Sequence, residues 1–147
     1  MDTKKIKNIF TSGSIDPSFI AESIAKHNHK TQIGAHSIFM GQVRRDQIDE
    51  NFVSAIEYTS YEEAALEKMH ESREEIFIKY KLTCLHVHHS LGVVKAGEIC
   101  LFVFASSAHR KPAMEACTEL VERIKAELPI WGREIMENDS YVWKENS

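Results

Sequence analysis

Apolar residues recur along the chain with two spacings, one typical of strands and the other of helices. Alternating or nearly continuous apolar residues predict strands at 5–10, 30–44, 52–60, 82–92 and 97–107, and a last strand followed by a tail within 130–147. The run GEICLFVFASS (97–107) is apolar over most of its length. Such a run indicates a central strand that is covered on both faces. Gly34 and Gly41 are candidate bulges within 30–44, and Gly97 centres a turn.

Helical spacing predicts three helices. Asp16 followed by Pro17 is a typical helix start, and this helix is expected to end near His27. The second predicted helix spans 61–81, with apolar positions at Ala65, Met69, Ile76 and Tyr80. The third follows the strand at 97–107 and ends at Pro129, because proline cannot continue a helix. Its predicted buried stripe consists of Met114, Cys117, Val121, Ile124 and Leu128.

The order of these elements predicts the fold class. Strands and helices are mixed without regular alternation of strand, helix and strand. This arrangement favours an α+β fold, with a largely antiparallel sheet and helices packed on it. A length of 147 residues suits one domain, which we expect to span residues 1–147.

Charge and composition exclude some classes of function. The formal net charge of −4 argues against general binding to nucleic acid. No apolar run approaches the roughly 20 residues that span a bilayer, so no membrane association is expected. The stretch MDTKKIKNIF shows no signal-peptide pattern, and we expect a cytoplasmic protein. The cysteines Cys84, Cys100 and Cys117 are expected to be buried, reduced thiols.

Cations gather where the third helix begins. His109 and Arg110 lie between the strand at 97–107 and this helix. Backbone N–H groups at a helix start, together with His and Arg side chains, form a compact anion site. Arg44, at the end of the strand at 30–44, could supply a second guanidinium to the same anion. A solvated turn with incidental cations is the alternative, and for Arg44 viewed alone a surface position is the more common situation.

Lys125 lies one residue beyond the apolar position Ile124, at the edge of the buried stripe of the third helix. Its stem would be partly covered and its amine partly desolvated, which suits an acid, a base or a nucleophile. The common alternative is a lysine whose amine reaches solvent and complements the helix C-terminus.

Three histidines in the stretch HVHH raise the question of a metal site. In a strand, His86 and His88 share one face and His89 lies on the other. Two ligands need a third from elsewhere, and no cysteine or carboxylate is spaced to suggest one. We therefore expect no metal site and no cofactor, and keep metal binding at these histidines as a minor alternative.

Three segments occur in this order: GAHSIFMGQVR (34–44), HHSLGVVKAGEICLFVFASSAHR (88–110) and ERIKAELPIWGREI (122–135). Together they resemble the catalytic subunit family of molybdopterin synthase. The family shows a G-A-x-x-x-F-x-G-x-V-R strand, an S-A-H-R motif and an L-K-x-x-x-P-x-W-K-(R/K)-E motif. The likeness covers about residues 33–143, and the pairing of S-A-H-R with K-x-x-x-P-x-W is specific.

The resemblance implies an enzyme activity and partners. The family is a sulfurtransferase that converts cyclic pyranopterin monophosphate into molybdopterin, for molybdenum cofactor biosynthesis. The sulfur comes from a C-terminal Gly-Gly thiocarboxylate on a small ubiquitin-like subunit. The family assembles as a heterotetramer, with a central homodimer of large subunits, and has an α/β-hammerhead-like fold. The three cysteines would then need no catalytic role.

The resemblance also implies roles for individual residues. Arg44, His109 and Arg110 match anion-binding residues, and Lys125 matches the essential lysine. The family's second lysine follows the tryptophan, where this chain has Gly132. Arg133, the next residue, is a candidate substrate-binding substitute, as is another cation. If neither substitutes, the chain would be a non-catalytic relative that binds a phosphorylated pterin or the small subunit.

The spacing of these residues predicts a shared site. Fifteen residues separate Arg110 from Lys125. At 1.5 Å per residue the two lie roughly 22 Å apart along one helix. A pterin monophosphate is too short to contact both. We therefore expect His109 and Arg110 of one subunit to face Lys125 of its two-fold mate.

Overall fold

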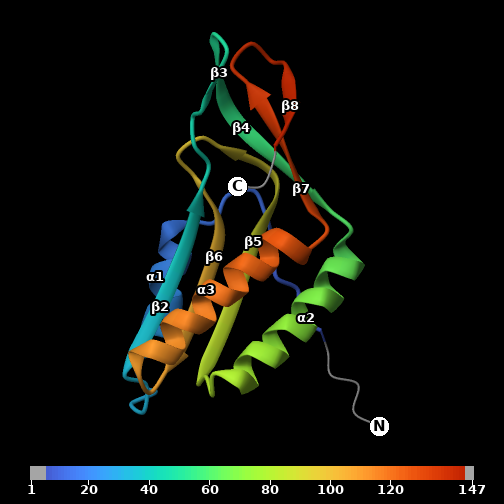
Figure 1. Cartoon of the computed structure of the whole chain (residues 1–147). Coiled ribbons are helices and arrows are strands. Elements are labelled where there is room, and N and C mark those ends of the chain that lie inside the picture. The colour runs from blue at the N-terminus through green and yellow to red at the C-terminus, as the bar shows by residue number, and fades with distance from the viewer. Residues whose placement is uncertain (1–5, 145–147) are drawn as a thin grey trace.

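The computed structural model describes residues 6–144 (Figure 1). Their helices and strands follow the chain in this order: β1 (Phe10–Ser12), α1 (Pro17–Ala25), β2 (Ala35–Gln42), β3 (Gln47–Ile48), β4 (Asn51–Ser60), α2 (Glu62–Lys79), β5 (Cys84–Lys95), β6 (Ile99–Ser107), α3 (Arg110–Glu127), β7 (Ile130–Met136) and β8 (Tyr141–Trp143).

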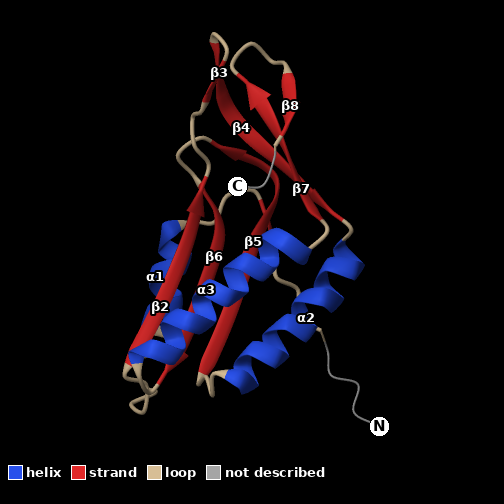
Figure 2. Cartoon of the chain, viewed as in Figure 1, coloured by secondary structure: helices blue, strands red, loops and turns tan. Residues whose placement is uncertain are grey.

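The strands form one mixed sheet in the order β2-β6-β5-β4-β7-β8, with β3 paired to β4 and β1 to β5. Only the β1–β5 pairing is parallel within residues 6–144. Helices α2 and α3 lie side by side on one face, and α1 lies on the other (Figure 2). The predicted α+β fold with a largely antiparallel sheet is therefore confirmed. No described helix is long and apolar enough to cross a membrane.

Strand β6 is the centre of the fold, between β2 and β5. Side chains of a strand point alternately to its two faces. Leu101, Val103 and Ala105 accordingly belong to the main core, which includes the buried side of α3. Phe102 and Phe104 point the other way and pack with Ile15 and Ile20. The prediction of a central strand covered on both faces is thus confirmed.

Helix α3 is confirmed, but one residue of its predicted stripe is wrong. Met114 is 57% exposed. The side chains that face the sheet are small near the start of the helix, where Ala113 and Ala116 are fully buried. Their size lets α3 approach β2 and β6 closely. Met114 lies one step around the helix, outside this contact, because successive residues are 100° apart.

Several strand boundaries differ from the sequence prediction. The first strand is Phe10–Ser12 rather than 5–10; of the predicted range, residue 5 lies outside the described residues and 6–9 are not strand. The predicted loop at 44–51 contains β3, which forms a hairpin with β4. The predicted tail contains β8, which forms a hairpin with β7. Both added strands are very short, so their residue pattern carries little signal. The three cysteines are buried and unbridged, as predicted.

Gly41 is confirmed as a bulge, since the β2–β6 register shifts between Gly41 and Gln42. Gly34 is not in a bulge. It precedes β2, and its backbone lies against the end of β6 and the turn that follows. Its N–H donates to the carbonyl of Ser107 at 3.0 Å. A Cβ at Gly34 would lie 2.1 Å from the carbonyl oxygen of Ala108. The turn before His109 therefore depends on glycine here.

Replacement of Gly34 by alanine should destabilise the protein by about 1–3 kcal/mol, because the clash is with backbone that must shift. Urea unfolding of Gly34→Ala against wild type measures this change. Thr31→Ala, at an exposed site in the same connection, is the control and should change stability by less than about 0.5 kcal/mol. Equal stability of Gly34→Ala and wild type would contradict this close approach.

Candidate functional site

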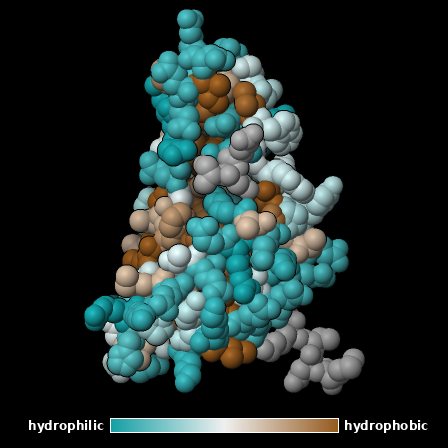
Figure 3. All heavy atoms as spheres, in the orientation of Figure 1, coloured by the Kyte–Doolittle hydropathy of each residue, from teal (hydrophilic) through white to brown (hydrophobic). Residues whose placement is uncertain are grey.

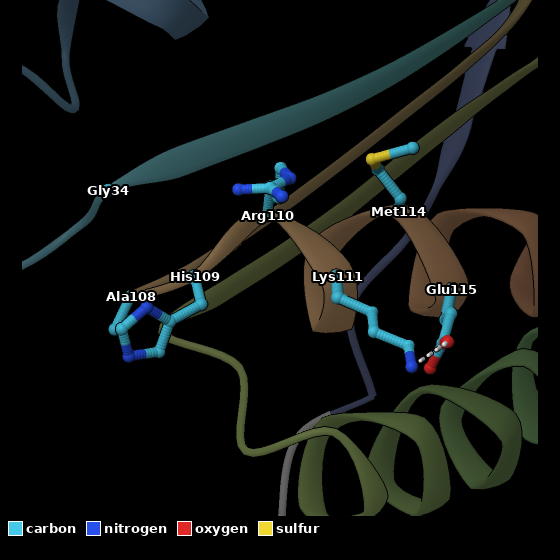
Figure 4. Close-up of a pocket in the computed structure, with 7 residues that line it drawn as sticks. All are labelled: Gly34, Ala108, His109, Arg110, Lys111, Met114 and Glu115. Carbon is cyan, nitrogen blue, oxygen red and sulfur yellow. Dashed lines mark ion pairs between the residues drawn. The ribbon is translucent and has the colours of Figure 1, made fainter.

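The start of α3 borders an open cavity of about 680 Å³ (Figure 4). Its lining comes from the turn after β6, the first turns of α3 and the residue before β2: Gly34, Ala108, His109, Arg110, Lys111, Met114 and Glu115. His109 is the N-cap residue, and its side chain makes no capping hydrogen bond. The first turn contains no acidic residue. This surface therefore has the positive charge and free donors that suit an anion.

The side chains at this cavity divide between two directions. The Lys111 amine pairs with the Glu115 carboxylate one turn along the helix, at 4.0 Å. Figure 4 shows Arg110 and Met114 projecting to the other side of this pair, with the His109 ring beside the turn. The Ser107 hydroxyl donates to the carbonyl of His109, which fixes the backbone before the helix. His109 and Arg110 are thus presented together on an ordered turn.

Lys125 lies near the other end of α3, beside a second cavity of about 270 Å³. The cavity is lined, besides Lys125, by residues of β2, β4, β6 and β7, of the loop after β2, and by the last described residue: Phe39, Met40, Gly41, Gln42, Arg44, Asp46, Ile56, Tyr58, Cys100, Glu134 and Lys144. The Lys125 side chain is half-buried. The predicted position at the edge of the apolar stripe is confirmed, since Ile124 is buried.

Two buried aromatic groups that can ionise lie beneath Lys125. His89 is 3% exposed and packs edge-on against Tyr58, with ring centroids 5.3 Å apart. Burial and, to a smaller extent, the nearby Lys125 charge lower the pKa of His89 to about 4. Burial, Cys100 and Glu134 raise the pKa of Tyr58 far above its usual value. Both groups are therefore uncharged at neutral pH, and charge at this site comes from the lysines, Arg44 and the carboxylates.

Gly132 lies in the same region as Lys125, and a second lysine lies beside it. A narrow cavity of about 20 Å³ is lined by both residues and by Tyr58, His89 and Lys144. The backbone N–H of Lys144 donates to the carbonyl of Gly132 at 2.9 Å. A Cβ at Gly132 would lie 3.7 Å from Cδ of Lys144 and 3.0 Å from a methyl group of Ile56. Lys144 thus occupies space next to the missing side chain of residue 132.

Arg133 points away from this site. It pairs with Glu57 on β4, and its guanidinium lies 3.9 Å from the centre of the Tyr141 ring. Gly132 is paired with Tyr58, and neighbouring residues of a strand face opposite sides. Arg133 is absent from the described lining of both cavities, so its predicted role in substrate binding gains no support from this geometry.

Arg44 lies with Lys125 rather than with His109 and Arg110 of the same chain. Its guanidinium is 3.3 Å from a carboxylate oxygen of Asp46 and largely exposed. The predicted contribution of Arg44 to the same anion as His109 therefore cannot come from one chain alone. Since α3 is continuous from Arg110 to Glu127, the separation of roughly 22 Å between Arg110 and Lys125 stands.

The sequence prediction missed three residues at the Lys125 cavity: Tyr58, Glu134 and Lys144. Glu134 is buried and is the glutamate of the WGREI segment, so its position in the motif was an available signal. Tyr58 reaches the site through the pairing of β4 with β7. Lys144 reaches the site because the chain turns back along β7 as strand β8. No local residue pattern predicts this return.

Comparison with known proteins identifies the family of this chain. The chain matches the MoaE protein family over residues 11–127. A molybdopterin synthase catalytic subunit from Oryza sativa subsp. japonica is 38% identical over 120 residues, which cover 82% of this chain and 61% of the relative. The chain therefore spans less than two thirds of the length of that relative.

Two solved structures share the fold. Molybdopterin synthase from Staphylococcus aureus has a TM-score of 0.81 and 28% identity, and the match covers 96% of this chain and 99% of that one. A complex of subunits 1 and 2 of molybdopterin-converting factor from Helicobacter pylori has a TM-score of 0.74 and 22% identity, covering 92% and 88%. Because the family match extends over most of its length, the chain belongs to the MoaE protein family.

Proposed function

We propose that this chain is the catalytic subunit of a molybdopterin synthase. As a sulfurtransferase, it would pass sulfur from a thiocarboxylated small subunit to cyclic pyranopterin monophosphate and so form the dithiolene of molybdopterin. The observation that carries the proposal is the convergence of Lys125 and Lys144 on Gly132, where the sequence lacks the second lysine of the resembled family. A second cation in this place favours an enzyme over a non-catalytic relative.

The two cavities suit different parts of this reaction. His109 and Arg110 offer donors and positive charge to the phosphate of the substrate. Lys125 can exchange a proton with the substrate as sulfur adds, or stabilise the tetrahedral intermediate as the acyl group leaves. Lys144 adds a second positive charge beside the intermediate. The uncharged His89 and Tyr58 form a partly dry floor, on which these charges act more strongly than in water.

We further propose that one substrate is held by two copies of the chain. His109 and Arg110 of one copy would face Lys125 and Arg44 of the other, which would bring all four to one substrate. Strand β2, at the edge of the sheet, lies between the two cavities and exposes Phe39 and Met40. Exposed Met114 adds to this apolar surface from α3. Figure 3 shows apolar atoms over the region where β2 lies. An apolar surface of this kind suits a subunit interface.

The tail of a sulfur-carrier subunit would approach Lys125 beside Gly132. Neither a Gly-Gly C-terminus nor Gly132 has a side chain that would block a close approach there. The thiocarboxylate would then end beside Lys125 and Lys144. The Helicobacter pylori complex, which has the same fold, contains two subunits and supports a partner of this kind.

The direct test combines the purified chain with thiocarboxylated small subunit and the precursor, in single turnover. Mass spectrometry should show a product that carries two added sulfurs, and release of the small subunit as carboxylate. Binding of the precursor without turnover would contradict the enzyme proposal and favour the non-catalytic relative.

Replacement of Lys144 by alanine should lower the single-turnover rate by about 10- to 100-fold, the effect of losing a hydrogen bond to a charged group. Arg133→Ala is the matched control and should stay within about threefold of wild type, because Arg133 faces the other side of β7. Gly132→Lys should restore part of the rate in the Lys144→Ala background, since it returns a cation to the same cavity. A larger loss in Arg133→Ala than in Lys144→Ala would reverse this assignment.

A further inference from the structure

A second group of reactive side chains lies away from Lys125, where the end of α1 meets β5. Its members are His27, Cys84 and His86, and one ligand atom from each lies within 4.8 Å of those of the other two. Within residues 6–144 this is the one group of three or more His, Cys, Asp or Glu side chains that meets this spacing. His27 lies in the turn after α1, and Cys84 and His86 share one face of β5.

The distances within this group match those around a tetrahedral metal ion. Nε2 of His27 lies 3.1 Å from Nε2 of His86. Zinc–nitrogen bonds of about 2.0–2.1 Å in tetrahedral geometry place two nitrogens roughly 3.3 Å apart. Only a small side-chain adjustment would therefore be needed for both rings to bind one ion.

The hydrogen bonds of His27 leave the correct nitrogen available. Its Nδ1 lies 2.7 Å from the carbonyl oxygen of Ser23, which can only accept, so Nδ1 carries the proton. The lone pair is then on Nε2, the atom that faces His86. Histidine ligands of metals typically donate their other N–H to a backbone carbonyl in this way.

The surroundings of Cys84 also suit a ligand. The Lys30 amine lies 2.9 Å from Sγ of Cys84 and can donate a hydrogen bond to that sulfur. Hydrogen bonds of this kind hold metal ligands in place. His27 and Cys84 are buried, and the partly exposed His86 leaves an entry path.

We propose that His27, Cys84 and His86 bind one Zn²⁺ ion, with the fourth position open to water. Two imidazoles and a thiolate are a donor set that zinc prefers. The ion would tie the turn after α1 to the central part of the sheet. The opposite face of β5 carries His89, under Lys125, so this site is separate from the proposed catalytic centre.

The proposed ligand group differs from the three histidines of the HVHH stretch and shares only His86 with them. His86 and His88 do share a strand face, but His88 stacks on Phe102 and packs edge-on against Phe19. The proposed third ligand is Cys84, two residues before His86 on the same strand face, a spacing that matches no common cysteine motif of zinc sites. His27 is remote in sequence and is brought close only by the fold.

The test uses the full chain without an affinity tag, dialysed against Zn²⁺ alone and analysed for metal. Wild type should retain about one zinc per chain, the stoichiometry of a single site. Cys84→Ser and His27→Gln should each weaken zinc binding by more than about 100-fold. Loss of a direct ligand should cost more than loss of an outer-shell hydrogen-bond partner, which typically costs about 10- to 100-fold in metal affinity. His88→Gln is the matched control, on the same strand face, and should bind as wild type does.

Spectroscopy of wild type keeps the proposal testable if a variant does not fold. The Co²⁺-substituted protein should show a thiolate-to-cobalt charge-transfer band, and X-ray absorption of the zinc form should show one sulfur and two imidazole nitrogens. A zinc sphere without sulfur, zinc binding that survives Cys84→Ser, or a site that takes copper but not zinc would overturn the assignment.

Discussion

Lys125→Ala should lower the rate of molybdopterin formation by about 10²–10⁴-fold, the range for loss of a positioned acid or base. The half-buried Lys125 lies above neutral His89 and Tyr58. In Lys125→Ala, a water molecule in the place of the amine would therefore be a poor substitute for it. Single-turnover assays with thiocarboxylated small subunit measure this rate. They isolate the chemical step from product release.

Two further variants make the Lys125 result specific. Lys125→Arg keeps the positive charge but cannot exchange a proton at neutral pH, so it should stay close to Lys125→Ala if proton transfer is the role. If charge stabilisation is the role, it should recover much of the rate. Lys26→Ala, at an exposed lysine after α1, should behave as wild type. A folded Lys125→Ala protein within tenfold of the wild-type rate would remove Lys125 from the mechanism.

Arg110→Ala should raise the KM for the precursor by about 10- to 100-fold, with a smaller change in kcat. A charge-assisted hydrogen bond to phosphate would be lost in the ground state and in the transition state alike. Steady-state kinetics with varied precursor concentration separates the two constants.

The control for Arg110 is Arg45→Ala. Arg45 pairs with Glu137 at 2.7 Å and lies outside the described lining of both cavities, so its loss should leave KM unchanged. An unchanged KM in Arg110→Ala would show that the phosphate binds elsewhere.

Elements with strong local patterns were predictable from the sequence. The apolar run of β6 and the periodicity of α3 fixed the centre of the fold, and so placed His109, Arg110 and Lys125. Met114 shows the limit of periodicity. Two buried alanines set the face of α3 toward the sheet, and a search for large apolar residues overlooks alanine.

The pairing of strands that are distant along the chain could not be predicted from the sequence. Tyr58 and Gly132 lie side by side because β4 pairs with β7, and Lys144 follows because the chain turns back along β7. The proposed replacement of a lysine at position 132 by Lys144 therefore depends on strand register rather than on any motif. The same holds for His27, which reaches Cys84 and His86 only through the packing of α1 on the sheet.

The most direct measurement of the shared site mixes two impaired variants, Lys125→Ala and Arg110→Ala, after subunit exchange verified by native mass spectrometry. Activity is assayed at a precursor concentration below the wild-type KM, where the weakened binding of Arg110→Ala also lowers the rate. Each mixed dimer carries one site with both substitutions and one with neither. Equal mixing should therefore restore about a quarter of the wild-type activity, since half of the dimers are mixed. If mixed dimers form and activity stays at the level of the separate variants, Arg110 and Lys125 do not meet across a two-fold interface.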